Sequence, residues 1–231
     1  MTVRIFRHVA HEGPGYFAEF LAARGIAHEL VCIDRGDAIP AALDGTSGLV
    51  FMGGPMSVND PLPWIAPAIA LIRRAVAADV PVLGHCLGGQ LMAKALGGKV
   101  TRNPVAEIGW MPVEQVAGEV PRRWLGTLPH AFPVYHWHGE TFEIPPGAAH
   151  LLRSPHCANQ AFVLGKHLAL QCHVEMTPAL VAAFIAGNGA TVPSSTVQSG
   201  AEMLRDVELR SAELQRVADV LYAHWIQGLR A

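Results

Sequence analysis

Short apolar runs alternate with helix-like segments through the first half of the chain. The runs have the length and apolar character of buried parallel strands, and the segments between them place apolar side chains on one helical face. Strand and helix in regular alternation favour a parallel sheet covered by helices on both faces. The predicted strands are 3–9, 28–33, 48–52 and 80–83, and the predicted helices are 16–23, 68–78 and 91–96.

The second half has a different rhythm, with shorter apolar runs joined by turns that contain Gly or Pro. We therefore expect an α/β fold with a largely parallel central sheet and additional antiparallel strands. It forms one domain over 1–231, in which 200–230 is a C-terminal helix. The predicted strands here are 99–102, 109–115, 131–137, 150–153, 161–164 and 167–172; the predicted helices are 178–186 and a single amphipathic one over 201–229.

Composition excludes several classes of protein. The chain has 231 residues, of which 51% are hydrophobic and 16% charged, so it can bury a core and is not disordered. With a net charge of −2 and no basic run, we expect neither nucleic acid nor an anionic membrane as partner. No run has the length of a secretion signal or a membrane span, and the four cysteines show no pairing pattern. We predict a cytoplasmic monomer or homodimer with reduced thiols.

One cysteine stands at the centre of a strand–turn–helix pattern, V-P-V-L-G-H-C-L-G-G-Q at 80–90. Gly84 and Gly88 flank Cys86 two residues away on either side, where strand and helix leave little room for a side chain. A helix N-terminus behind the turn favours thiolate over thiol. The pattern is that of a nucleophile elbow with sulfur in place of oxygen, so it predicts Cys86 as a nucleophile.

A cysteine nucleophile needs a base, a group that orients the base, and donors for the oxyanion. His173 and Glu175 follow a predicted strand and share one face of an extended chain. In a parallel sheet they lie at the same edge as the elbow, so Glu175 could orient the imidazole toward the thiol. The backbone N–H of Leu87 and an N–H from Gly53 or Gly54 are the candidate oxyanion donors.

Four segments taken together resemble the class I glutamine amidotransferase family of the Cys-His-Glu type. They span residues 45–176, and the resemblance is strongest to free-standing proteins similar to the amidotransferase half of GMP synthase. The family's last motif usually reads Q-F-H-P-E, and here Cys172 and Val174 replace Phe and Pro while H-x-E is kept. The segments are G-G-P at 53–55, G-H-C-L-G-G-Q at 84–90, W-H-G-E at 137–140 and Q-C-H-V-E at 171–175.

The resemblance implies a flavodoxin-like fold and an enzyme that hydrolyses the side-chain amide of glutamine. Cys86 would form a γ-glutamyl thioester and release ammonia. His173 would transfer the proton, and Glu175 would orient the imidazole of His173. Gly54 and Leu87 would form the oxyanion hole. The residues implied to hold the substrate are Gln90, Trp137, Gly139 and Glu140.

Neither a cofactor nor a metal is expected. His136 and His138 form H-x-H, but the sequence offers no third metal ligand in view. No nucleotide-binding loop of a synthase is present, so the ammonia acceptor is expected to be a separate synthase, or absent. Two alternatives remain open: hydrolysis of γ-glutamyl peptides or polyamines, and a non-hydrolytic regulatory subunit of the same fold.

Overall fold

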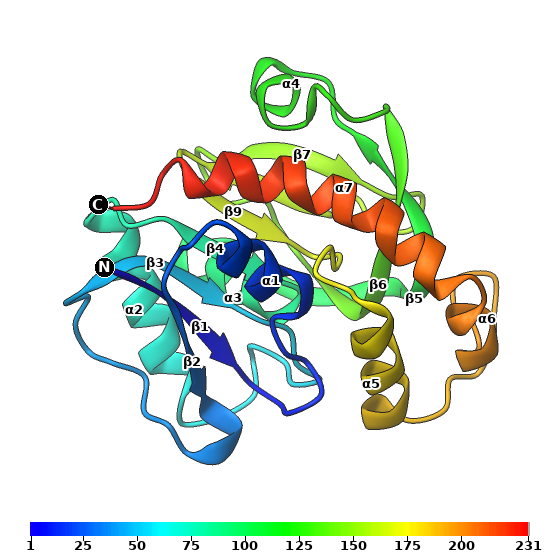
Figure 1. The fold of residues 1–231 in the computed structure, drawn as a ribbon, viewed down its shortest axis with the longest axis horizontal. Coiled ribbons are helices and arrows are strands. Elements are labelled where there is room, and N and C mark those ends of the chain that lie inside the picture. Colours follow the sequence, from blue (N-terminus) through cyan, green and yellow to red (C-terminus); the bar gives the residue numbers. More distant parts are fainter. Residues whose placement is uncertain (231) are drawn as a thin grey trace.

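One sheet runs through the whole molecule in the computed structural model, which describes residues 1–230 (Figure 1). Its nine strands lie in the order β2-β1-β3-β4-β9-β8-β7-β5-β6. The strands are β1 Thr2–Arg7, β2 His28–Cys32, β3 Thr46–Phe51, β4 Val82–His85, β5 Val100–Gln115, β6 Ala131–Phe142, β7 Ala149–Arg153, β8 Ala161–Leu164 and β9 His167–Leu170.

The sheet changes direction at β9. From β2 to β9 every neighbouring pair is parallel, and from β9 through β8, β7, β5 and β6 every pair is antiparallel. A hairpin with its turn at Gly165-Lys166 joins β8 to β9, with Leu164 opposite His167. The predicted fold class, a mostly parallel central sheet with added antiparallel strands, is confirmed.

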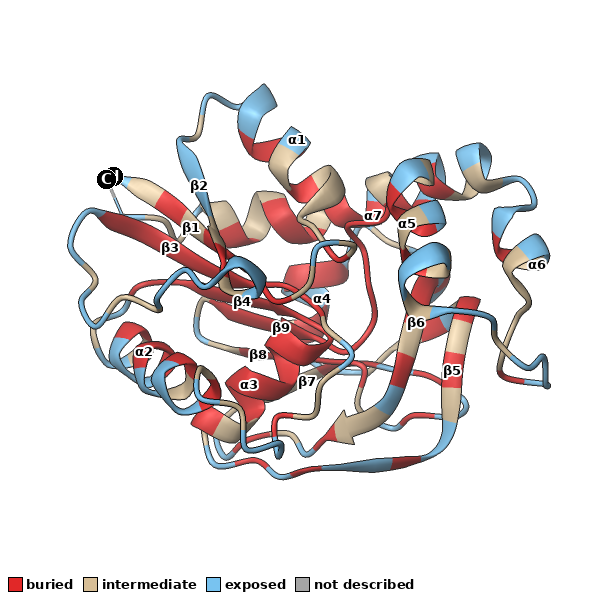
Figure 2. Ribbon diagram, turned by 90° about the horizontal axis from the view of Figure 1, so that it is seen from below, coloured by how far each residue is buried: buried red, intermediate tan, exposed pale blue. Residues whose placement is uncertain are grey.

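Helices cover both faces of the sheet (Figures 1 and 2). On one face α2 and α3 bury apolar side chains against β1, β3 and β4, and on the other α1, α5 and α7 pack over a second apolar cluster. Within residues 1–230, no helix is both long and apolar enough to cross a membrane. The helices are α1 Gly15–Ala23, α2 Ile65–Ala77, α3 Leu87–Ala95, α4 Glu119–Leu125, α5 Pro178–Asn188, α6 Gly200–Leu204 and α7 Val207–Ile226, with a 3₁₀ turn, η1, at Ile33–Arg35.

The prediction of one helix from 200 to 230 is wrong. The chain forms α6, passes through an extended Arg205 and a left-handed Asp206 (φ +54°), and starts again as α7. The indole N–H of Trp110 donates to the carbonyl of Met203 at 2.9 Å, a carbonyl that a continuous helix would use for its own ladder. The periodicity of apolar residues along a helix cannot predict a contact between residues so far apart in the sequence.

Two smaller differences concern the second half. The separate strands predicted at 99–102 and 109–115 are parts of the single strand β5, whose pairing with β6 is irregular between Arg102 and Glu107. The helix α4 was not predicted, since its seven residues carry two arginines and a proline and show little periodicity.

Candidate active site

The elbow at Cys86 forms as predicted. Cys86 follows β4 directly, has φ +48° and precedes the first residue of α3, so the helix begins four residues earlier than expected. A methyl group at Gly84 would lie 2.4 Å from the backbone of Gly88, and one at Gly88 only 2.0 Å from the carbonyl oxygen of Phe51. Both positions therefore require glycine, and the turn holds the thiol at the carboxyl edge of the sheet.

Neighbouring strands bring the histidine to the same edge. β4 and β9 are adjacent and parallel, with His85 opposite Leu170, and the Cys86 N–H donates to the Leu170 carbonyl at 2.8 Å. His173 lies three residues beyond Leu170 and pairs through its backbone with Tyr135 of β6. The segment that carries the histidine is thus fixed by both halves of the sheet.

The imidazole of His173 is held by Glu175. Nδ1 and the Glu175 Oε1 are 2.6 Å apart, and Oε2 accepts from the Val174 N–H at 2.9 Å. His173 is fully buried, and its other nitrogen, Nε2, has no hydrogen-bond partner of good geometry among the described residues. The ring is therefore oriented by a carboxylate on one side and left available on the other.

Electrostatics couple the three groups. Burial alone would lower the pKa of His173, but the charge of Glu175, the nearby Cys86 sulfur and the bond to Glu175 outweigh it and raise that pKa well above its usual value. Burial alone would raise the pKa of Glu175; the charges of His85 and His173 and the bond from His173 bring it down to about 2. The arrangement favours the imidazolium form of His173 beside the Cys86 sulfur.

A second histidine, His85, lies against the carboxylate of Glu175. His85, the last residue of β4, places Nε2 3.6 Å from Glu175 Oε2 and 3.0 Å from the hydroxyl of Tyr222 on α7. Burial lowers the pKa of His85, although the charge of Glu175 opposes the effect. The C-terminal helix is therefore in contact with the strand that carries the nucleophile.

The residues implied to bind substrate surround a cavity of about 730 Å³ that also contains Cys86. The backbone carbonyl of Trp137 is 3.8 Å from Cys86 Sγ, and the Ser57 hydroxyl donates to Glu140 at 3.0 Å. The Gln90 amide donates to Gln171 at 3.2 Å, and Gln171 in turn donates to the Cys86 sulfur at 3.6 Å. The lining shared with the predicted set is Gly54, Gln90, Trp137, Gly139 and Glu140.

The two candidate oxyanion donors lie together. A methyl group at Gly54 would be 2.9 Å from the side chain of Leu87, so the glycine loop after β3 packs on the start of α3. Leu87 is the first residue of that helix, where backbone N–H groups have no partner within the helix. This geometry suits an anion next to Cys86.

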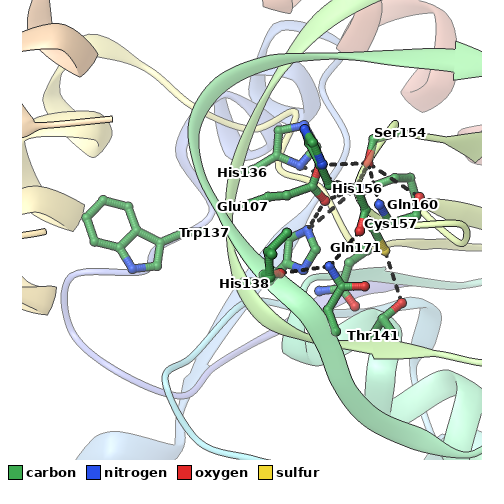
Figure 3. A network of polar contacts seen from close by, with 12 residues as sticks. Glu107, His136, Trp137, His138, Thr141, Ser154, His156, Cys157, Gln160 and Gln171 are labelled. Atoms are coloured by element: carbon green, nitrogen blue, oxygen red, sulfur yellow. Dashed lines mark hydrogen bonds and ion pairs between the residues drawn. The ribbon is translucent and has the colours of Figure 1, made fainter. Parts of the chain in front are cut away.

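A polar network behind the cavity fixes the W-H-G-E segment (Figure 3). Along β6 the side chains of His136 and His138 point into the network, whereas Trp137 points away from it. Glu107 of β5 is fully buried; its carboxylate faces His138 Nε2 at 3.1 Å and accepts from Gln160 at 2.7 Å. His138 Nδ1 lies 3.0 Å from the Glu140 carbonyl, so the network holds the backbone that lines the cavity.

The same network contains a group of three potential metal ligands, which includes His138 but not His136. Donor atoms of Glu107, His138 and Cys157 lie within 4.8 Å of one another. Each already has a partner: Cys157 Sγ lies 3.1 Å from the Thr141 hydroxyl, and Glu107 and His138 face each other. These contacts are those of a hydrogen-bonded network rather than of an open coordination site.

Sequence reasoning missed three buried residues in and around the candidate site. Glu107 lies within β5 and is fully buried, and no motif of the sequence singles it out. His85 is hidden inside the elbow motif, and its partner Tyr222 lies 137 residues away. Glu12 lines the cavity and stands just before Gly13-Pro14-Gly15, where no sequence motif marks it as functional.

Known proteins with similar sequence and structure support one family. Residues 17–189 match the family described as "Glutamine amidotransferase class-I". A crystal structure of a glutamine amidotransferase from Methylobacillus flagellatus is 48% identical, with a TM-score of 0.94 over 99% of this chain and 95% of that one.

Two curated relatives agree. The glutamine amidotransferase-like protein YfeJ of Salmonella typhimurium is 28% identical over 96% of this chain and 95% of its own length. The glutamine-hydrolysing GMP synthase of Aeropyrum pernix is 34% identical over 70% of this chain, which spans only 31% of that protein. The chain belongs to the class I glutamine amidotransferase family and is an enzyme of the glutamine amidohydrolase and amidotransferase type.

Proposed function

We propose that the chain hydrolyses a γ-glutamyl amide, in the first instance that of glutamine, through a covalent thioester on Cys86. The observation that carries the proposal is the arrangement at the carboxyl edge of β4 and β9: a thiol on an elbow, beside a buried imidazole whose Nδ1 is held by Glu175 at 2.6 Å. This is the nucleophile, base and orienting group that acyl transfer requires.

The steps follow from the positions of the groups. The Cys86 thiolate attacks the amide carbon while backbone N–H groups at Gly54 and Leu87 hold the developing oxyanion. His173 gives its proton to the departing nitrogen, the C–N bond breaks and ammonia leaves. Water, deprotonated by the same imidazole, then attacks the thioester and releases glutamate and the thiol. Glu175 keeps the imidazole oriented throughout.

Side chains and backbone around the cavity suit the α-amino and α-carboxylate ends of the substrate. We assign this contact to Gln90 and to the backbone at Trp137, Gly139 and Glu140, which line the cavity beside the thiol. The Glu107 network supports the assignment because it anchors the Glu140 carbonyl through His138.

A larger γ-glutamyl amide is the second candidate substrate. The cavity, about 730 Å³, lies well inside the range of small-molecule sites and is several times larger than a glutamine side chain. It extends from Cys86 to the irregular part of β5 at Arg102 and Val105, where the amine part of a γ-glutamyl peptide or polyamine would fit. With glutamine as substrate, a separate synthase would accept the ammonia.

The test uses a diazoketone analogue of glutamine followed by peptide mass spectrometry. We expect one adduct, on Cys86, and none in the C86A variant. A parallel assay compares amine release from glutamine with release from γ-glutamyl peptides and γ-glutamyl polyamines. An adduct on another residue, or turnover that survives C86A, would overturn the proposal; a preference for the larger amines would select the second candidate.

A further inference from the structure

A further side chain lies at the carboxyl edge of the parallel strands, where the active site is. The glycine loop follows β3, Cys86 follows β4 and His173 follows β9. In an open parallel sheet the loops at the carboxyl ends meet around one site. The loop after β1 reaches the same place and brings Glu12, a carboxylate to which the mechanism above gives no role.

Glu12 is buried, with 4% of its surface exposed, and still lines the cavity together with Cys86. A methyl group at Gly53 would lie 2.3 Å from Glu12 Oε2 and 3.0 Å from Cε1 of His173. The carboxylate and the imidazole edge thus flank the same glycine, and a side chain at residue 53 would displace the carboxylate from this position.

The position of Glu12 relative to the imidazole of His173 determines which part of a substrate the carboxylate can contact. Cε1 is bonded to both ring nitrogens: Nδ1, which Glu175 holds, and Nε2, which has no hydrogen-bond partner of good geometry among residues 1–230 and faces the Cys86 thiol. A departing amine must lie against Nε2 to receive its proton, at the part of the cavity that Glu12 lines together with Cys86. We propose, on the basis of the function proposed above, that Glu12 is a further substrate-contacting residue whose carboxylate accepts a hydrogen bond from the leaving amine.

The environment of Glu12 makes this contact dependent on pH. The pKa of the Glu12 carboxyl is raised to about 7, mainly by burial; the charge of Glu175 acts in the same direction, whereas His173 and Asn188 oppose it. The carboxyl is therefore neutral in acid and ionised in base around neutrality. The groups that face Glu12 are His173 and Glu175 after β9, Tyr135 of β6, Asn188 of α5 and His11, whose Nε2 is 3.8 Å from Oε1.

The proton balance of the step is unchanged. As the S–C bond forms and the C–N bond breaks, the proton on His173 Nε2 moves to the nitrogen. Ionised Glu12 accepts a hydrogen bond from that nitrogen and transfers no proton itself. The contact is strongest for a nitrogen that gains positive charge, so it favours basic amines and ammonia over weakly basic arylamines.

The first experiment needs no substrate. The rate of Cys86 carboxamidomethylation by chloroacetamide is measured from pH 5.5 to 9 in the wild type, in Glu12→Gln and in the control Glu19→Gln, which changes an exposed acid on α1. Since ionised Glu12 stabilises the imidazolium beside the thiolate, the ratio of rates at pH 8 and pH 6 should fall by about threefold or more in E12Q alone. A profile in E12Q that matches the wild type would overturn the proposal.

The second experiment isolates the leaving group. In E12Q, kcat/KM for glutamine should fall by about tenfold or more and that for γ-glutamyl-p-nitroanilide by less than about threefold, because p-nitroaniline leaves with little need of a proton. An equal fall for both would overturn the contact with the amine. If the wild type turns over neither compound, the proposed function fails, and the alkylation profile alone decides whether Glu12 is coupled to the thiol and imidazole. Melting of E12Q at pH 8, expected at or above that of the wild type, verifies the fold.

Discussion

Two buried glutamate–histidine pairs support the candidate active site, and they are built from different halves of the sheet. Glu175 and His173 follow the last parallel strand, with 2.6 Å between carboxylate and ring. Glu107 and His138 lie opposite each other on the antiparallel strands β5 and β6, with 3.1 Å between them. All four side chains are at most 5% exposed, and both carboxylates have a lowered pKa.

The pairs differ in the contacts of the histidine nitrogen that does not face the glutamate. In His138 it lies 3.0 Å from the Glu140 carbonyl, so both nitrogens face oxygen atoms and the ring is fully engaged. In His173 it has no hydrogen-bond partner of good geometry among residues 1–230, and it faces the Cys86 thiol. A buried polar atom without a partner is costly, so it persists where another requirement outweighs the cost. The first pair therefore positions backbone, and the second is available for proton transfer.

Glu175→Gln should have the largest effect. Glutamine keeps the volume but removes the charge that orients and supports the imidazolium, so we expect kcat with glutamine to fall by roughly 1000-fold or more. The matched variant is Glu107→Gln, which makes the same chemical change in the other pair and should retain most of kcat. Steady-state kinetics with both purified variants measure the effect. Equal losses in the two would show that the pairs do not differ in role.

Much of this comparison could be predicted from the sequence, but only for one pair. His173 and Glu175 are two residues apart on an extended segment, so local geometry places their side chains on the same face. The elbow motif predicts Cys86 as the nucleophile. Glu107 and His138 are brought together by strand pairing, with an irregular register just before Glu107. Sequence periodicity predicts that both strands exist and does not give the register that joins them.

The same limit applies to the C-terminal region. The apolar spacing of 207–226 predicts a helix correctly. The break before it at Asp206 depends on Trp110, whose indole N–H donates a hydrogen bond to the carbonyl of Met203. The contact of Tyr222 with His85 likewise joins positions that no local pattern relates. What the sequence could not supply is in each case a contact between distant segments.

His138→Gln should mainly affect stability. It leaves the Glu107 carboxylate buried beside the cavity without its imidazole, and removing one member of a buried pair costs about 3 kcal/mol or more. Urea unfolding measures the loss, and the double variant E107Q/H138Q should recover part of it because no carboxylate is then left unpaired. KM should rise more than kcat falls, since the Glu140 backbone loses its anchor. A double variant less stable than the sum of the singles would contradict the pairing.

Acid should weaken both pairs. A carboxyl whose folded pKa is lowered, such as Glu175 at about 2, stabilises the fold above its unfolded value near 4.5, and that contribution is lost as pH falls toward 2. For Glu175 the loss is on the order of 2–3 kcal/mol, and Glu107 acts in the same direction. Urea unfolding at pH 7 and pH 3 should show a smaller fall in E175Q and in E107Q than in the wild type. A fall of the same size in all three proteins would place the acid sensitivity elsewhere.

The smallest effect concerns the sulfur atom beside each pair. Cys86 lines the cavity next to His173, whereas Cys157 is buried against Thr141 in the Glu107 network. Burial raises the pKa of the Cys157 thiol, and raises that of Cys172 further, so both stay protonated and shielded at pH 8. Limiting iodoacetamide on the native protein should therefore modify Cys86 first and leave these two thiols intact until the protein is unfolded in urea. Early modification of Cys157, read by peptide mass spectrometry, would mean that the second pair opens to solvent and is not the fixed support of the cavity wall.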